Sequence, residues 1–211
     1  MNFFTKSVVS AALAVGMGVI GTSSAQASTL NRSDFNADAV NFDFQSTALN
    51  STTATDGNLT VINGVVANVG SVGNLAGNSY YDGADSSVIR FNFLNSVSAV
   101  GVDFVAFNND ITLSLFDSAN NLINSFTQDW TTLPTAAGFP FGFIGLNAGS
   151  NSIAYATIDT PLNGNELYID NIIYQSVTTT AVPEPASMLG LLGIGALGAI
   201  AGIKRKQEQK A

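Results

Sequence analysis

The chain has 211 residues, enough for one domain with short accessory segments. It contains neither cysteine nor histidine, which excludes disulfides, zinc sites built from these residues, and catalytic triads that need an imidazole base. A formal net charge of -8, with only 7 lysines and arginines, argues against nucleic acid as a partner because phosphate contacts need cations. A hydrophobic content of 46% nevertheless predicts a folded protein.

The N-terminus has the features of a secretory signal peptide. Lys6 supplies a positive charge, and an apolar stretch follows from residue 8 to residue 20. Ala25 and Ala27 fit the small-residue pattern that precedes a cleavage site. We therefore expect residues 1–27 to form a signal helix that is removed. A membrane span is the less favoured alternative, because a span takes about 20 residues.

The body of the chain, residues 28–175, is predicted to be an all-β domain. Short stretches alternate apolar and polar residues with period 2, as strands buried on one face do. The predicted strands are 39–45, 59–62, 65–69, 88–94, 99–107, 111–117, 121–128, 141–146, 152–159 and 167–174. Asn- and Gly-rich turns between them favour an antiparallel, jelly-roll-like β-sandwich.

Two segments predicted as loops carry candidate glycan-binding residues. Tyr80 and Tyr81 lie in the Gly- and Asn-rich stretch 71–87, and Trp130 lies in a second loop-like segment. Aromatic rings can stack on the apolar faces of sugars. The alternative is that these rings pack down and seal the sandwich, and for the two tyrosines we favour it.

The acidic residues of the body suit a hard cation. Residues 28–181 contain thirteen aspartates and glutamates but only two arginines. Asp43 lies in the first of the alternating strands and Asp170 in the last, and Ca²⁺ takes carboxylate oxygens. We predict a structural Ca²⁺ site at Asp43 and Asp170. The alternative is that Asp170 accepts hydrogen bonds from a neighbouring loop.

The body offers no catalytic constellation in its sequence. Without histidine or cysteine, the remaining route is a pair of carboxylates, as in glycoside hydrolysis. The body holds a single glutamate, Glu166, and no motif pairs it with an aspartate. We therefore predict a protein that is not an enzyme.

The C-terminus has the features of a membrane anchor. A Thr-rich linker, residues 176–181, precedes an uncharged apolar run at 186–203 that is long enough for a transmembrane helix. A stop-transfer cluster follows at Lys204, Arg205 and Lys206. We expect residues 207–211 to form a cytoplasmic tail.

A short motif precedes the predicted helix. Pro183, Glu184 and Pro185 form a triplet whose prolines keep it extended and outside the helix. The triplet, the apolar run and the basic cluster together resemble the sorting signal of PEP-CTERM proteins of Gram-negative bacteria, here at residues 182–206. The resemblance implies export by the general secretion machinery, transit through the inner membrane, processing by an exosortase, and delivery to the cell surface or the extracellular space.

The body has a looser resemblance to the jelly-roll ectodomains of exported and carbohydrate-binding proteins. It rests on the stretches 100–104, 113–117, 143–146 and 168–174. In such domains an aspartate of the final strand often serves a structural Ca²⁺, a position that Asp170 matches. We predict a structural or adhesive protein of exopolysaccharide or biofilm. The alternative is a lectin-like carbohydrate-binding module, and a glycoside-active enzyme is less favoured.

Overall fold

The computed structural model describes residues 28–83, 88–107, 109–160 and 166–177. In these residues every strand pair is antiparallel, which confirms the all-β prediction. The predicted signal peptide, sorting motif and transmembrane helix lie outside this part of the chain. Within it, no helix is long and apolar enough to cross a bilayer.

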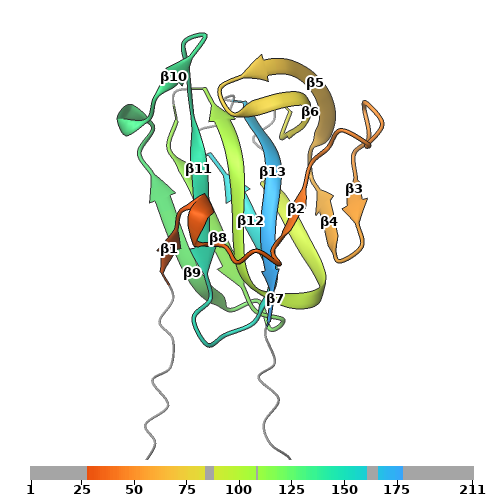
Figure 1. Ribbon diagram of the computed structural model, residues 1–211, viewed down its shortest axis with the longest axis vertical. Helices are drawn as coiled ribbons and strands as arrows, with labels where there is room; N and C mark the ends of the chain where they lie inside the picture. The colour runs from red at the N-terminus through yellow and green to blue at the C-terminus, as the bar shows by residue number, and fades with distance from the viewer. Residues whose placement is uncertain (1–27, 84–87, 108, 161–165, 178–211) are drawn as a thin grey trace, which may run out of the picture.

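The described residues form thirteen strands and two short 3-10 helices (Figure 1). The strands are β1 (Thr29–Leu30), β2 (Val40–Phe42), β3 (Ala54–Asp56), β4 (Leu59–Ile62), β5 (Val65–Val72), β6 (Leu75–Tyr81), β7 (Ile89–Ala106), β8 (Ile111–Phe116), β9 (Leu122–Gln128), β10 (Thr135–Ala136), β11 (Phe139–Asn147), β12 (Ile153–Asp159) and β13 (Leu167–Ser176). The 3-10 helices are η1 (Arg32–Asp34) and η2 (Trp130–Thr132).

The strands form two packed layers that share β7. Its first half pairs with β4 and β12, and β8 and β9 extend this back layer. Its second half pairs with β13 and β11 in the front layer, which β6 and β5 extend. The sequence predicted two strands here, but the structure has one strand of 18 residues. It changes layers at its exposed middle, where Leu94 is 82% exposed.

The hydrophobic core lies between the layers and follows the predicted alternation. Ile89, Phe91 and Phe93 point into it from the first half of β7. Val102 and Phe104 point into it from the second half. Each such side chain contributes about 1.5–3 kcal/mol when fully buried. The core therefore confirms that these short alternating stretches are strands with one face inside.

Strict period-2 alternation within the predicted strand 167–174 would put Tyr168, Asp170, Ile172 and Tyr174 on one face, and the structure shows that this is wrong beyond the middle of β13. Ile169 lies in the core, and strict alternation would put Ile172 outside, yet Ile172 is fully buried in the core as well. The pairing with β7 shifts between residues 170 and 173, where Asn171 has a φ of 48°. This bulge adds one residue and exchanges the two faces of the strand. Tyr168 and Asp170, which precede the bulge, lie on the outer face of the front layer.

The predicted loop at residues 71–87 is largely a β-hairpin. β5 and β6 pair throughout and turn at Gly73, whose φ of 61° suits glycine. The tip crosses the outer face of the front layer and reaches β11. There the Asn74 side-chain amide donates a hydrogen bond to the Gly142 carbonyl at 2.7 Å. A Cβ on Gly73 would overlap the Phe141 ring, so the contact requires glycine.

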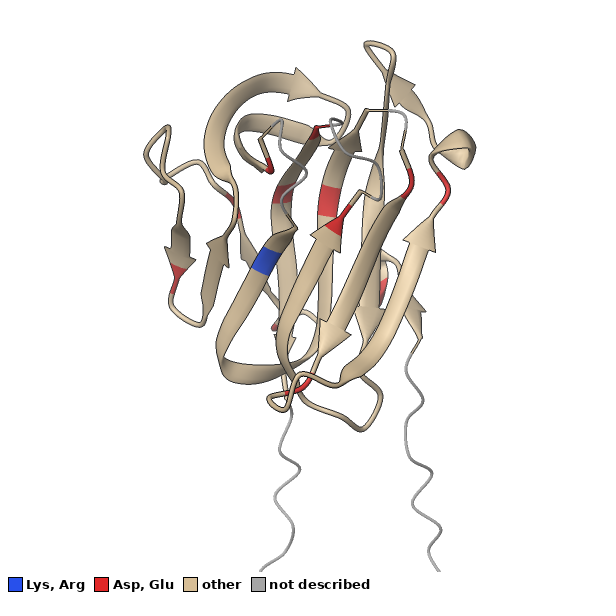
Figure 2. Cartoon of the chain, turned by 180° about the vertical axis from the view of Figure 1, so that it is seen from behind, with Lys and Arg blue, Asp and Glu red and all other residues tan. Residues whose placement is uncertain are grey.

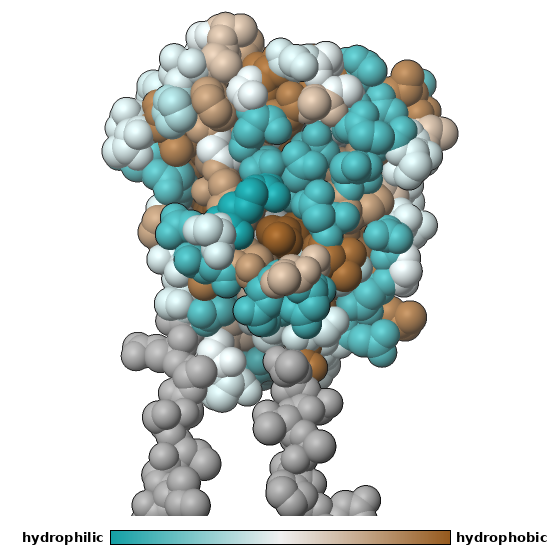
Figure 3. Space-filling model, in the orientation of Figure 1, coloured by the Kyte–Doolittle hydropathy of each residue, from teal (hydrophilic) through white to brown (hydrophobic). Residues whose placement is uncertain are grey.

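The two ends of the described domain lie at the same end of the sandwich (Figure 1). β1 begins there and β13 finishes there, at Ser176, the first residue of the predicted linker. We call this the proximal end. The β5–β6 hairpin and β10 lie at the opposite, distal end (Figure 1). The face seen in this view is mostly polar, with hydrophobic residues visible near its middle (Figure 3).

Candidate functional site

Four aromatic rings form a row across the distal end of the front layer. Tyr81 stacks on Tyr168 with ring centroids 5.1 Å apart and planes at 17°. Phe107 lies 5.9 Å from Tyr168 on its other side and 4.3 Å from Phe139. All four rings are partly exposed. We call them the aromatic row.

Strand pairing explains why these rings meet. Tyr168 of β13 lies opposite Tyr81 of β6 on one side and Val105 of β7 on the other. Phe107 follows two residues after Val105, just past the end of β7, so it shares the same face. Val105 also lies opposite Phe141 of β11, which brings the start of β11 and Phe139 beside Phe107. The row therefore crosses four neighbouring strands.

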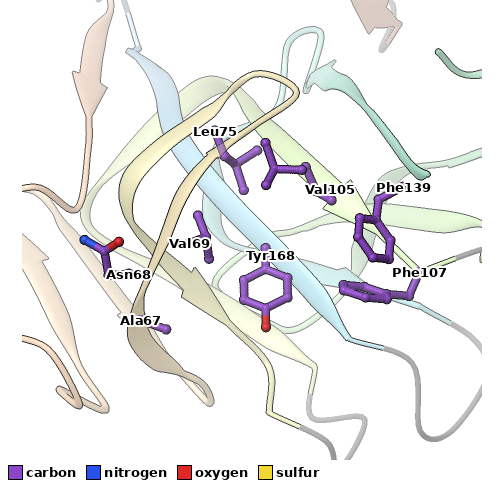
Figure 4. Close-up of a pocket in the computed structure, with 9 residues that line it drawn as sticks. Ala67, Asn68, Val69, Leu75, Val105, Phe107, Phe139 and Tyr168 are labelled. Carbon is purple, nitrogen blue, oxygen red and sulfur yellow. The ribbon is translucent and has the colours of Figure 1, made fainter. Parts of the chain in front are cut away.

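A cleft of about 230 Å³ lies between the aromatic row and the β5–β6 hairpin (Figure 4). The hairpin contributes Val69 and Leu75, and the sheet contributes Val105. The remaining residues that line it are Ala67, Asn68, Val72, Phe107, Phe139 and Tyr168. The lining is mainly apolar and aromatic, as in ligand pockets generally. The cleft can therefore receive the apolar face of a ligand and leave polar groups at its edge.

Carboxylates lie beside Tyr168 in the row. The Tyr168 hydroxyl donates a hydrogen bond to Glu166 Oε2 at 2.9 Å. Burial, and then the bond to the Glu166 carboxylate, raise the pKa of Tyr168. Burial raises the pKa of Asp82 to about 6, and the charges of Glu166 and Asp159 add to this rise. The Leu167 amide opposes the rise by donating a hydrogen bond to Asp82 Oδ1 at 3.1 Å. The row is therefore bordered by negative charge.

Tyr80 does not belong to this site: the structure excludes it as a glycan-binding candidate and agrees with the favoured alternative that its ring packs down. Its side chain is fully buried and stacks on Phe44 at 5.5 Å. The hydroxyl donates to the Thr52 carbonyl at 2.6 Å and accepts from the Gly64 amide at 3.1 Å. Burial raises the pKa of Tyr80 to about 12. The alternation of β6 sends Tyr80 into the core and Tyr81 to the outer face.

Trp130 lies apart from the row. It begins η2 and is partly buried. Its backbone amide donates to Asp110 Oδ1 at 3.3 Å. Asp129 caps the same turn by accepting from the Thr131 amide at 2.8 Å. A role of Trp130 in glycan binding stays a prediction.

Asp170 is held by hydrogen bonds on the outer face of β13. Its carboxylate accepts from the Ala76 amide at 3.3 Å and from the Asn171 amide at 2.8 Å. Burial raises its pKa to about 6, to which the charges of Asp43 and Asp103 add. Among the residues that the structure describes, no group of three or more acidic side chains could hold a metal. The Ca²⁺ site at Asp43 and Asp170 stays a prediction.

The N-terminal segment covers the proximal part of the same outer face. Arg32 of η1 pairs with Asp103 at 2.6 Å and lies 4.8 Å from the centroid of the Phe143 ring. This contact neutralises one of the buried carboxylates of the front layer. The cleft beside the aromatic row lies outside the part that this segment covers.

Sequence reasoning missed three of the four rings in the row. Phe107 and Phe139 lie just past one strand and at the start of another, and Tyr168 was counted only as part of the closing strand. The available signal was that the rings lie alternately at the ends and the starts of their strands, which places them at one end of the sheet once antiparallel neighbours are assigned. That assignment needs the strand order, which alternation does not give.

The comparisons with known proteins concern the two parts of the chain separately. Residues 181–206 match the PEP-CTERM protein-sorting motif. No curated protein matches the chain. The sandwich is similar to the K2 cleaved adhesin domain of Lys-gingipain, at 9% identity over 66% of this chain and 99% of that domain, with a TM-score of 0.45.

Two further structures of carbohydrate-related proteins are similar. A family 29 carbohydrate-binding module aligns over 70% of this chain and 99% of its own at 9% identity, with a TM-score of 0.40. The catalytic domain of a GH87 alpha-1,3-glucanase aligns over 71% of this chain and 30% of its own at 16% identity, with a TM-score of 0.40. Similarity at this level carries no argument about function. The chain is a β-sandwich followed by a PEP-CTERM sorting motif, which indicates an exosortase-sorted surface protein.

Proposed function

We propose that this protein is a non-enzymatic, jelly-roll-like matrix protein that binds exopolysaccharide through the aromatic row and serves a structural or adhesive role in biofilm. It would reach the surface through the general secretion machinery and the inner membrane, with its exosortase acting near Pro183, Glu184 and Pro185. The observation that carries the proposal is the position of the row. It lies at the distal end, away from Ser176, where the chain continues toward the sorting motif.

The length of β13 separates the two ends. It runs for ten residues from Leu167 at the distal end to Ser176 at the proximal end. An antiparallel strand of this length spans about 34 Å. A protein held at the surface through its C-terminal segment would thus present the aromatic row outward. Ligands in the surrounding matrix could reach it there.

The shape of the row favours a polymer. Its rings come from four neighbouring strands, so it extends across three strand spacings, roughly 14 Å. Partly exposed aromatic side chains offer large contact area and lose little freedom on binding. Successive rings could therefore contact successive sugars of one chain.

A lectin-like module for short soluble glycans is the second candidate. The cleft of about 230 Å³ beneath the hairpin favours it, because it would enclose one end of a small ligand. Oligosaccharides of increasing length distinguish the two functions. Affinity that keeps rising with length supports polymer binding along the row, and affinity that stops at one or two sugars supports the lectin.

The direct test is co-sedimentation of the exported protein with exopolysaccharide from the same cells. We expect Phe107→Ala and Phe139→Ala to reduce the bound fraction. The matched control is Tyr155→Ala, which removes an aromatic ring from the outer face of the back layer. Equal binding of all variants would contradict the proposal. So would a deletion strain with unchanged surface polysaccharide and attachment.

A further inference from the structure

Carboxylates lie beside Tyr168, one of the residues that line the distal cleft. Glu166 bonds to the Tyr168 hydroxyl, and the Asp82 carboxylate accepts from the amide of Leu167 next to it. Asp159 ends β12 close enough to act on the charge of Asp82. Asp82 is only 4% exposed, so its charge is poorly screened by solvent. Figure 2 shows acidic residues at this end of the molecule in red.

Cations are absent from the described lining of the cleft. The described residues contain two arginines and no lysine. Arg32 is paired with Asp103 at 2.6 Å. Arg90 lies over the Tyr155 ring, 3.6 Å from its centroid, in the back layer. Neither arginine lines the cleft.

From this combination of rings, hollow and charge, we infer that the cleft binds ammonium groups, and that its ligand is an amino-sugar polysaccharide with free amines. The inference rests on the proposed polysaccharide binding and specifies its chemical class. The faces of aromatic rings attract cations, and most strongly where water is partly excluded. Carboxylates beside the rings add attraction for the same cation and repel acidic sugars.

Each group has a distinct part in this recognition. Phe107, Phe139 and Tyr168 present the aromatic surface, and Glu166 supplies charge next to it. Glu166 also positions Tyr168 by accepting a hydrogen bond from its hydroxyl. The hairpin residues Val69 and Leu75 cover the apolar part of the sugar ring. The length of the row lets neighbouring amines of one polymer bind at once.

The test uses the full exported protein and three oligosaccharide probes of equal length. These are oligomers of glucosamine, of N-acetylglucosamine and of galacturonic acid, titrated calorimetrically just below neutral pH. We expect the free-amine oligomer to bind about tenfold more tightly than the acetylated one, and the acidic oligomer to bind most weakly. Added salt should reduce the difference between them.

A charge variant tests the role of the carboxylate. Glu166→Gln keeps an acceptor for Tyr168 but removes the charge, so it should weaken binding of the glucosamine oligomer several-fold. The matched control is Asp38→Asn, which removes an exposed charge shortly before β2, near the proximal end. It should leave the affinity unchanged.

The outcomes separate this inference from the function on which it rests. Equal affinity for amine and acetylated oligomers, with loss of binding in Phe107→Ala, overturns the inference and leaves polysaccharide binding intact. Tightest binding of the acidic oligomer also overturns it. If neither these probes nor the cells' own exopolysaccharide binds, both the inference and the proposed function fail.

Discussion

Each layer of the sandwich carries an aromatic cluster on its outer face, and the two clusters differ in their surroundings. In the back layer, Phe116 stacks on Tyr155 with centroids 4.7 Å apart and planes at 8°. Arg90 lies over the same Tyr155 ring, and its Nε donates to Asn92 Oδ1 at 2.7 Å. The charged group of Arg90 is thus bound by the Tyr155 ring and by Asn92.

In the front layer, neither of the two described arginines lies over a ring of the aromatic row. Three of its four rings line a hollow, and the charged groups beside them are carboxylates. Partly exposed aromatic residues on a strand are therefore not in themselves a binding surface. What distinguishes the aromatic row is an open cleft with carboxylates, rather than a cation, next to its rings.

The largest effect should be on the pH dependence of stability, and it arises on the front layer. Asp82 and Asp170 are 4% and 1% exposed, and burial raises the pKa of each to about 6 from 3.8. Between these values the folded state binds more protons than the unfolded state. The free energy of unfolding should therefore fall as pH rises from about 4 to about 6, by on the order of 2–3 kcal/mol per carboxyl.

Urea unfolding at a series of pH values measures this slope. Asp82→Asn and Asp170→Asn should each flatten it, because the variant side chain does not titrate. Below this window the trend should reverse, since hydrogen bonds hold the pKa of the exposed Asp117 and Asp129 carboxyls below 3.8. A free energy of unfolding that rises steadily from pH 4 to pH 7 would contradict the prediction.

The next effect concerns ligand affinity. Replacing Phe107 or Phe139 by alanine should weaken polysaccharide binding about tenfold or more, since each ring contributes stacking surface beside the cleft. Phe116→Ala in the back-layer cluster should leave the affinity unchanged. Titration of all three variants with one polysaccharide preparation measures the contrast. An equal loss in Phe116→Ala would abolish the distinction between the clusters.

A smaller effect separates the adjacent tyrosines of β6. Tyr80→Phe removes a hydroxyl that is bonded to Thr52 and Gly64 inside the protein, and it should cost about 1–2 kcal/mol of unfolding free energy. Binding should be unaffected because the ring is buried. Tyr81→Ala should weaken binding instead. Chemical denaturation and ligand titration of both variants test this difference between the two tyrosines. Reduced affinity in Tyr80→Phe would contradict the prediction.

The smallest effect is expected at Arg90. Arg90→Met removes the charge over Tyr155 but keeps much of the apolar stem, so it should destabilise the protein by less than about 1 kcal/mol. Polysaccharide affinity should stay the same. A thermal melt and one titration suffice as measurements. A marked loss of affinity would show that the back-layer cluster is itself a binding surface.

The sequence predicted much of the fold locally. The strand at residues 59–62 was placed with its correct bounds, and the alternation of Ile89, Phe91 and Phe93 correctly predicted the face of β7 that lies in the core. The PEP-CTERM motif was also recognisable, because its proline triplet, apolar run and basic cluster are contiguous. Each of these features depends on neighbours within a few residues. Local sequence therefore suffices to detect them.

The bend in β7, the bulge at Asn171 and the hairpin at Gly73 depended on the tertiary structure instead. The bulge arises because pairing with β7 fixes the backbone, and one added residue exchanges the faces. β7 bends because its two halves pair with different strands, and the hairpin tip is placed by the contact of Gly73 with Phe141. The aromatic row has the same origin. Composition and alternation predicted an acidic β-sandwich, and the contiguous sorting motif indicated export. Only the pairing of strands far apart in sequence brought Tyr81, Phe107, Phe139 and Tyr168 together in one row.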